Sequence, residues 1–230
     1  MSKVSIENLS DAELDAYLTH QEELRCCPPT PEQKDGGAPR GQSIVMLVSG
    51  LLGMFASFEL LEAEKELLAN PGGQLSCDIN PIVGCGTFLQ SSANTLFFGI
   101  SNAVFGLAFF SGIVALGLVL LARGKFGIWL WRLIDVAMVG AFAWLLWFWH
   151  TAFFVERGLC PYCMVVWLAT IPLVCTVLGR SAQARHYPIP DGVRRVLFRG
   201  RWWITAGIYL ALVILAAVVF RDQWLAMLSA

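Results

Sequence analysis

Two of the chain's seven cysteines form a C-x-x-C motif, Cys160-Pro-Tyr-Cys163, beside a long apolar stretch. At the start of a helix this spacing brings the two sulfur atoms close enough to join, and the helix dipole stabilises a thiolate. Pro161 suits the first position of such a helix. The motif therefore predicts a redox-active dithiol, although a simple structural disulfide has the same spacing.

A second pair, Cys77 and Cys85, lies in a segment where Pro81, Gly84 and Gly86 interrupt any continuous helix. We expect a constrained loop that carries two cysteines. If this loop lies above the C-x-x-C motif, the two pairs can exchange disulfides and pass electrons from outside into a membrane. The alternative is zinc bound by the four cysteines, for which the gap between Cys77 and Cys85 is outside the usual spacing.

The composition indicates an integral membrane protein. Of 230 residues, 57% are hydrophobic and 14% are charged, and the net charge is -1. An ordinary soluble domain has roughly a quarter of its residues charged. The balance excludes an ordinary soluble globule, and it also excludes a nucleic-acid-binding surface. The composition therefore indicates that the chain lies in a lipid bilayer.

Five uncharged apolar stretches are each long enough to cross a hydrocarbon core about 30 Å thick. They cover residues 41–58, 94–122, 136–155, 158–179 and 202–220. The first begins only after some forty residues of polar sequence, unlike a cleaved signal peptide. The predicted fold class is therefore an all-α membrane protein with five transmembrane helices.

The positions of lysine and arginine predict the orientation, because these residues are retained on the cytoplasmic side. Thirteen of the sixteen fall on one side of the five spans, and Lys65, Arg157 and Arg221 fall on the other. We expect a cytoplasmic N-terminus and an external C-terminus. All four cysteines of the two pairs then lie outside, where disulfides persist.

The spans divide the chain into four parts. Residues 1–43 are expected to form a mobile cytoplasmic tail without an assigned role, 44–180 the main bundle, 181–201 a basic cytoplasmic loop at anionic headgroups, and 202–230 the fifth helix with a short external C-terminus. Cys26 and Cys27 are expected to be reduced and inert. Cys175 is expected to be a small buried hydrophobe.

The motifs together resemble the vitamin K epoxide reductase family and its bacterial homologues. The resemblance covers residues 44–180 and rests on Cys77-x7-Cys85, Leu89-x-Ser91, Phe98-Gly99, Ser101-Asn102-x-x-Phe105-Gly106 and Cys160-x-x-Cys163. It implies a four-helix transmembrane bundle around a quinone. A fifth transmembrane helix is typical of the bacterial versions.

The resemblance also implies roles for the cysteines. Cys77 and Cys85 would be the shuttle pair that takes electrons from a thioredoxin-fold protein. Cys160 would exchange with Cys85, and Cys163 would face the quinone. Residues corresponding to the pocket are Asn102 and Phe105, with Ser91 and Trp167 as further members. Trp167 stands where the vertebrate enzyme has tyrosine.

Polar residues in the spans have structural alternatives as well. The amide of Asn102 is expected to donate to a quinone carbonyl, and a helix-to-helix bond is the alternative. His150 is a candidate proton donor to a reduced quinone, although an interfacial histidine is the more ordinary reading. Asp135 is expected to pair with Arg132, and Glu59 to reach headgroups or the loop.

The expected function is thiol oxidation in the bacterial cytoplasmic (inner) membrane. A separate DsbA-like thioredoxin-fold protein would be reoxidised, and a menaquinone or ubiquinone would receive its electrons without a metal. We expect a separate partner because only residues 221–230 follow the fifth span. Reduction of vitamin K epoxide on the same fold is the alternative.

Overall fold

The computed structural model describes residues 27–73, 75–80, 83–95 and 99–228, together with residues 10, 12, 14 and 15. Its described part contains five helices long and apolar enough to cross a membrane. They are α3 (Arg40–Ala69), α5 (Asn102–Leu121), α6 (Ile128–His150, continued by a π-helical turn at Thr151–Val155), α7 (Pro161–Gln183) and α9 (Arg201–Val219). The predicted all-α membrane protein with five spans is confirmed.

Two helices begin eight residues away from the predicted starts of their spans. α5 begins at Asn102 instead of residue 94, because residues Ser92–Thr95 form a short 3-10 turn and the Ser101 side chain caps the helix by accepting the Ala103 N–H. α6 begins at Ile128, eight residues before the predicted start. Hydropathy misses its first two turns because they include the charged residues Arg132 and Asp135.

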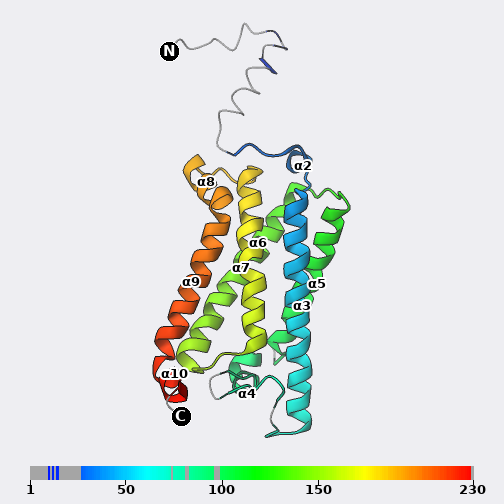
Figure 1. The fold of residues 1–230 in the computed structure, drawn as a ribbon. Helices are drawn as coiled ribbons and strands as arrows, with labels where there is room; N and C mark the ends of the chain where they lie inside the picture. The colour runs from blue at the N-terminus through cyan, green and yellow to red at the C-terminus, as the bar shows by residue number, and fades with distance from the viewer. Residues whose placement is uncertain are drawn as a thin grey trace.

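α7 is the central helix of the bundle. It packs against α3, α6 and α9, and α3 also packs closely along α5 (Figure 1). The contact between α3 and α5 is close because small residues lie in it: a side chain at Gly53 would run into the Phe110 ring. α9 lies against the far side of α7 and is a peripheral fifth helix.

The redox loop and the C-terminal helix lie at the same end of the bundle. Beyond α3 the chain forms the loop with Cys77 and Cys85, followed by the short helix α4 (Gly86–Gln90). Helix α10 (Arg221–Leu228) follows α9 at this end (Figure 1). We call it the outer end, in keeping with the orientation that the lysine and arginine distribution predicts.

The opposite end of the bundle is covered by residues 27–39, here called the N-terminal strap, which includes the short helix α2 (Pro31–Lys34). Hydrogen bonds join the strap to the bundle: Gln33 Nε2 to Gln183 Oε1 (2.8 Å), Trp131 Nε1 to the Gly36 carbonyl (2.8 Å) and Arg180 Nη2 to the Gly37 carbonyl (2.6 Å). The prediction of a mobile tail up to residue 43 is therefore wrong for residues 27–43. Cys27 is buried in the strap, and Cys26 lies outside the described residues.

A buried arginine anchors the strap. The Arg180 guanidinium lies 3.5 Å from the centre of the Trp131 ring, and its Nη1 lies 3.2 Å from His186 Nε2. Burial and the charges of Arg180 and Arg132 lower the pKa of His186 to about 4, so its neutral ring can accept this hydrogen bond. The Gly37 carbonyl, the Trp131 ring and the His186 imidazole replace part of the water that the guanidinium loses, whereas its Nε has no partner among the described residues.

One prediction for this end is wrong, and the basic loop at anionic headgroups stays a prediction. Asp135 accepts a hydrogen bond from Ser181 Oγ at 2.8 Å, and Arg132 donates to the backbone carbonyl of His186 instead of forming the expected pair. The basic loop contains a helix, α8 (Asp191–Arg199), which packs on α7. Arg194 is buried in that contact, where its Nε donates to the Ala182 carbonyl at 2.8 Å.

Candidate active site

Four cysteines converge at the outer end of the bundle. Cys77 and Cys85 form a disulfide, with their Cα atoms 5.8 Å apart. The sulfur of Cys85 lies 3.7 Å from the sulfur of Cys160, which is the N-cap of α7. Cys163 lies one turn further into the same helix. The two pairs that the sequence singles out are thus brought into contact through Cys85 and Cys160.

A carboxylate holds the cysteine loop in this shape. Oδ1 of Asp78 accepts the backbone N–H groups of Cys85 (2.8 Å) and Gly86 (3.1 Å), and Oδ2 accepts that of Leu75 (3.3 Å). A side chain at Gly84 would collide with the same carboxylate. Gly84 and Gly86 therefore allow the backbone to wrap around the Asp78 side chain, and this orients Cys85.

The loop is also attached to the residues just before the C-x-x-C motif. Val83 forms an isolated parallel β-bridge with Leu159, and the Gly84 N–H donates to the Leu159 carbonyl at 2.9 Å. After the π-helical turn that ends α6, the Gly158 N–H donates back to Ala152 at 3.2 Å. This tight turn presents Leu159 to the loop and sets the distance between Cys85 and Cys160.

Cys160 has the surroundings of a nucleophilic thiolate. The Cys163 thiol donates a hydrogen bond to its sulfur, and the backbone N–H of Cys163 donates at 3.4 Å. These bonds lower the pKa of the Cys160 thiol despite its burial, and the α7 N-terminus adds favourable dipole charge. The expected effect of the C-x-x-C motif on its first cysteine is present in the geometry.

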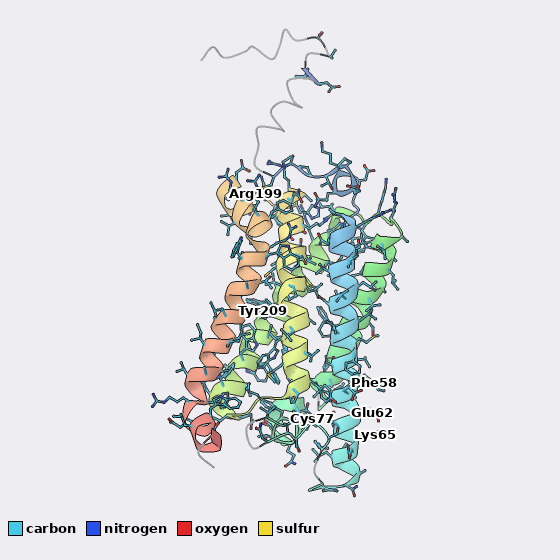
Figure 2. The ribbon with its side chains drawn as sticks, viewed as in Figure 1. Phe58, Glu62, Lys65, Cys77, Arg199 and Tyr209 are labelled. Carbon is cyan, nitrogen blue, oxygen red and sulfur yellow. A yellow bond between two sulfur atoms is a disulfide. The ribbon has the colours of Figure 1, made fainter. Side chains whose placement is uncertain are left out.

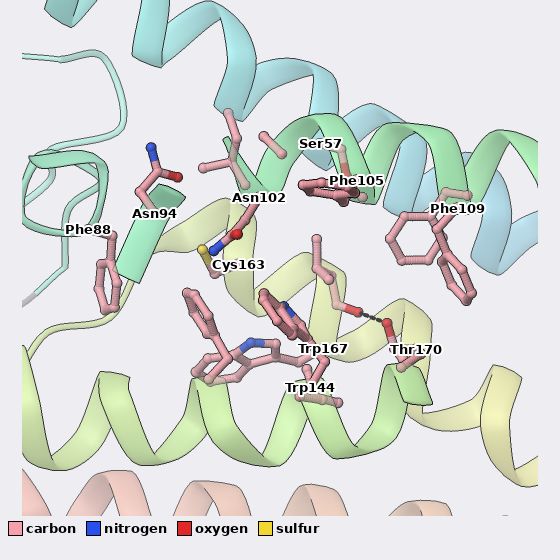
Figure 3. A pocket seen from close by; sticks show the side chains of 18 of the residues that line it. Ser57, Phe88, Asn94, Asn102, Phe105, Phe109, Trp144, Cys163, Trp167 and Thr170 are labelled. Carbon is pink, nitrogen blue, oxygen red and sulfur yellow. Dashed lines mark hydrogen bonds between the residues drawn. The ribbon is translucent and has the colours of Figure 1, made fainter. Parts of the chain in front are cut away.

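An apolar cavity of about 590 Å³ begins at Cys163 and extends between α3, α5, α6 and α7. Three of the four predicted pocket residues line it: Asn102, Phe105 and Trp167 (Figure 3). Aromatic rings make up much of the remaining wall, including Phe88, Phe109, Trp144 and Phe148. Trp167 is held in place by Trp149 and Phe153, whose ring centres are each 6.1 Å away.

The cavity reaches the lipid-facing surface between α5 and α6. Phe105 and Ile100 line it and are each 43% exposed. On the α6 side the lining residues Ala137 and Gly140 are exposed, and a side chain at Gly140 would meet nothing within 4 Å. A ligand dissolved in the membrane can therefore approach Cys163 sideways from the bilayer.

Asn102 contributes a free acceptor to this apolar wall. Its Nδ2 donates to the Ala93 carbonyl at 2.6 Å, whereas its buried Oδ1 has no partner among the described residues. By contrast, the Thr170 hydroxyl donates to the Val166 carbonyl at 2.7 Å (Figure 3). The cavity thus fits a flat, largely apolar molecule that can donate a hydrogen bond to Asn102, as a hydroquinone does.

Two candidate residues lie elsewhere. The Ser91 hydroxyl donates to Glu156 and does not line the cavity, so it ties the segment after α4 to the turn before α7. His150 is exposed at the end of α6, with its ring 5.6 Å from that of Phe154, and it does not line the cavity either. Their positions outside the cavity lining support structural roles for Ser91 and His150.

The sequence predicts that Glu59 reaches headgroups or the loop, but it did not reveal how three carboxylates, Asp78, Glu59 and Glu64, organise the outer end. Asp78 closes the cysteine loop. Glu59 accepts the Tyr162 hydroxyl at 3.1 Å, so α3 contacts the middle of the C-x-x-C motif. Glu64 accepts from Asn94 at 2.9 Å. The one usable signal was an aspartate directly after Cys77 in a loop rich in glycine, since such a side chain commonly caps nearby backbone N–H groups.

The zinc alternative receives no support from the geometry. Within the described ranges, no group of three or more His, Cys, Asp or Glu side chains is placed to hold a metal ion. Cys77 and Cys85 are bonded to each other, which uses both of their sulfurs.

The fold and the site define an integral membrane protein in which two adjoining cysteine pairs meet an apolar, lipid-accessible cavity, an arrangement suited to redox chemistry. A family model described as the vitamin K epoxide reductase family matches residues 44–178. The chain belongs to this family, whose members are membrane proteins that couple disulfide chemistry to quinones and act with a redox partner. None of the curated proteins compared with the chain matches it.

Proposed function

We propose that this protein is a quinone-dependent thiol-disulfide oxidoreductase that reoxidises a separate DsbA-like thioredoxin-fold protein. The observation that carries the proposal is the 3.7 Å contact between Cys85 and Cys160, with Cys163 on the wall of the cavity. A continuous path for two electrons thus leads from the loop disulfide to a lipid-accessible site. Disulfide bonds in exported proteins are the proposed product.

The first exchange takes place at the loop. A thiolate of the reduced partner attacks Cys77, the Cys77–Cys85 bond breaks, and Cys85 leaves as a thiolate. The second partner thiol then displaces Cys77, so that the partner is oxidised and the loop holds two thiols. Cys77 is only 4% exposed and Cys85 is fully buried, so the loop has to shift before a partner sulfur can reach them.

The second exchange takes place between the loop and α7. The Cys85 thiolate attacks Cys160 of an oxidised Cys160–Cys163 pair, and Cys163 leaves as a thiolate. Cys77 then attacks Cys85, which restores the loop disulfide and leaves Cys160 and Cys163 reduced. Cys163 is the member of the pair that borders the cavity, and a quinone held there would accept the two electrons and two protons of this dithiol.

The remaining cavity residues orient the ligand and exclude water. Phe105 and Trp167 offer ring faces, and the unpartnered Oδ1 of Asn102 can accept a hydroxyl hydrogen of the reduced ring. This refines the sequence-based expectation, in which the amide only donates. Menaquinone and ubiquinone both meet these requirements, and the proposed location is the bacterial cytoplasmic membrane with the cysteines outside.

Anaerobic mixing of the protein with a reduced DsbA-like carrier and a soluble menaquinone or ubiquinone analogue tests the proposal. Quinol should form in step with oxidised carrier. Cys163→Ala should abolish quinol formation with either the carrier or a small dithiol, whereas Cys77→Ala should abolish only the reaction with the carrier. Cys175→Ala is the matched control, because Cys175 lies on α7 away from the cavity lining. Equal small-dithiol activity of the Cys77 and Cys163 variants would contradict the order of the relay.

A parallel reaction with vitamin K epoxide separates the proposal from its alternative. The proposed enzyme consumes carrier thiols beyond the amount that its own disulfides can oxidise only when a quinone is present. Turnover of the epoxide at a rate equal to or above that of the quinone would favour the epoxide reductase. Stoichiometric zinc in the purified protein would favour neither and would contradict both.

A further inference from the structure

The central helix α7 contains a proline in its membrane-spanning part. Pro172 has no N–H to donate, so the carbonyl of Leu168, four residues earlier, loses its usual partner within the helix. Leu168 is 54% exposed on the lipid-facing side of α7, where no water can replace that partner. The sequence thus creates a backbone acceptor that must be satisfied by another helix.

The fifth helix supplies the missing donor. The Tyr209 hydroxyl, midway along α9, donates to the Leu168 carbonyl at 2.7 Å (Figure 2). This distance is typical of an O–H···O hydrogen bond. α9 lies beyond the residues matched by the family model, so this contact is added to the four-helix core from outside.

The supported carbonyl lies within the part of α7 that forms the cavity wall. Val166, Trp167 and Thr170 line the cavity, and Leu168 lies between them on the other side of the helix. A proline break is a point at which a helix can bend. Movement of α7 at Pro172 would therefore displace Trp167 and Thr170 relative to α5 and α6.

We propose that Tyr209 is a positioning residue, which restricts movement of α7 at Pro172 through the Leu168 carbonyl and so holds the cavity wall in its ligand-binding shape. The inference rests on the proposed function only in taking the cavity as the quinone site. The hydrogen bond itself, and its dependence on proline, can be measured without a quinone.

The first measurement is the carbonyl ¹³C shift of Leu168 in the full chain in lipid nanodiscs. Labelling leucine carbonyl carbons together with alanine nitrogens selects Leu-Ala pairs, of which Leu168-Ala169 is one. Tyr209→Phe removes only the hydroxyl and should move this signal upfield, as loss of a hydrogen bond does. In a Pro172→Ala background the new N–H satisfies Leu168, and Tyr209→Phe should leave the signal in place.

The second measurement is equilibrium binding of a menaquinone analogue, followed by quenching of tryptophan fluorescence. Loss of one hydrogen bond should weaken binding by about five-fold in Tyr209→Phe. In Pro172→Ala the same substitution should have no effect, which a general packing role for Tyr209 would not explain. Tyr209→Trp, whose indole N–H can donate but is placed differently, should restore binding in part at most.

The outcomes separate the inference from the proposed function. An unchanged Leu168 signal in Tyr209→Phe overturns the hydrogen bond, whatever the protein does. A shifted signal with unchanged quinone binding overturns the positioning role and leaves the redox proposal intact. If the Pro172→Ala protein does not fold, the Tyr209→Phe signal and binding data still decide the first two points. If the wild-type chain does not bind the quinone analogue, the proposed function alone is contradicted.

Discussion

Oδ1 of Asp78 accepts the backbone N–H of Cys85 at 2.8 Å, so the residue that follows one loop cysteine orients the other. Replacement of Asp78 by alanine removes this bond and those to Gly86 and Leu75. We expect exchange between Cys85 and Cys160 to slow by about 10- to 100-fold, because small displacements of reacting atoms are costly. The rate can be followed by trapping the Cys85–Cys160 disulfide in a Cys163→Ala background.

Two further variants make this result specific. Asp78→Asn retains an oxygen acceptor for Cys85 and Gly86 and should give an intermediate rate. Asp222→Ala removes an exposed carboxylate at the same end of the molecule and should leave the rate unchanged. Wild-type exchange in Asp78→Ala would show that the loop is held by other contacts.

The hydrogen bond from Cys163 to Cys160 should lower the pH at which Cys160 attacks Cys85. Because the lowered pKa of Cys160 arises first from the Cys163 thiol, loss of that donor should raise the pKa. Below its pKa Cys160 is protonated and does not attack. The pH at which the rate of attack on Cys85 reaches half its maximum should therefore be higher in Cys163→Ala than in Cys163→Ser, which still carries a hydroxyl donor.

This comparison uses two variants that cannot complete the relay, so both accumulate the Cys85–Cys160 disulfide. After a jump from acid, samples are quenched and the freed Cys77 thiol is alkylated and counted by mass spectrometry. Identical pH midpoints in the two variants would mean that the helix N-terminus and backbone N–H groups alone stabilise the thiolate.

Asn102 should affect the quinone step alone. Asn102→Ala removes the unpartnered Oδ1 from the cavity, and we expect quinol formation to slow by about one to two orders of magnitude, equivalent to roughly 1 to 3 kcal/mol. Thr170→Val is the control, because the Thr170 hydroxyl already donates to Val166. Formation of the Cys85–Cys160 disulfide is measured in parallel. A fall in that rate would show that Asn102 acts mainly by holding the Ala93 turn.

Much of this architecture could be predicted from the sequence. Five apolar stretches and the charge distribution identify the spans, since transfer into hydrocarbon depends on composition more than on detailed packing. The C-x-x-C motif fixes the start of α7 because its proline suits the first helical position and Cys160 caps the helix. Asn102 and Phe105 line the cavity for a related reason, since their motif lies at the start of α5, and Trp167 lines it about one turn after Cys163 on α7.

The contacts between distant segments could not be predicted in this way. Nothing in the polar composition of residues 27–39 shows that the Gly37 carbonyl meets Arg180, because the arginine comes 143 positions later and lies in the last turn of α7. Ser91 matched the family pattern, yet its hydroxyl turns to Glu156. Side-chain direction in a loop depends on which neighbours the tertiary fold provides, and hydropathy carries no information on that choice.

The N-terminal strap should contribute to the stability of the folded protein. Gly36 has a φ of +87°, and a side chain there would collide with the carbonyl of Phe126. The backbone N–H of Phe126 donates to the Gly36 carbonyl at 3.0 Å. Gly36→Ala should therefore lower the free energy of unfolding by roughly 1 to 3 kcal/mol. Gly41→Ala is the matched control, since a side chain there meets nothing within 4 Å and alanine favours helix at the start of α3.

Thermal unfolding in detergent should show a lower midpoint for Gly36→Ala and an equal or higher one for Gly41→Ala. Limited proteolysis should cut the strap of Gly36→Ala faster, because release of the Gly36 and Gly37 carbonyls removes the partners of Trp131 and Arg180. Exchange between Cys85 and Cys160 should stay at the wild-type rate, since the strap lies at the opposite end of the bundle (Figure 1). If both glycine variants unfold at the same temperature as the wild type, the strap does not contribute to the stability of the bundle.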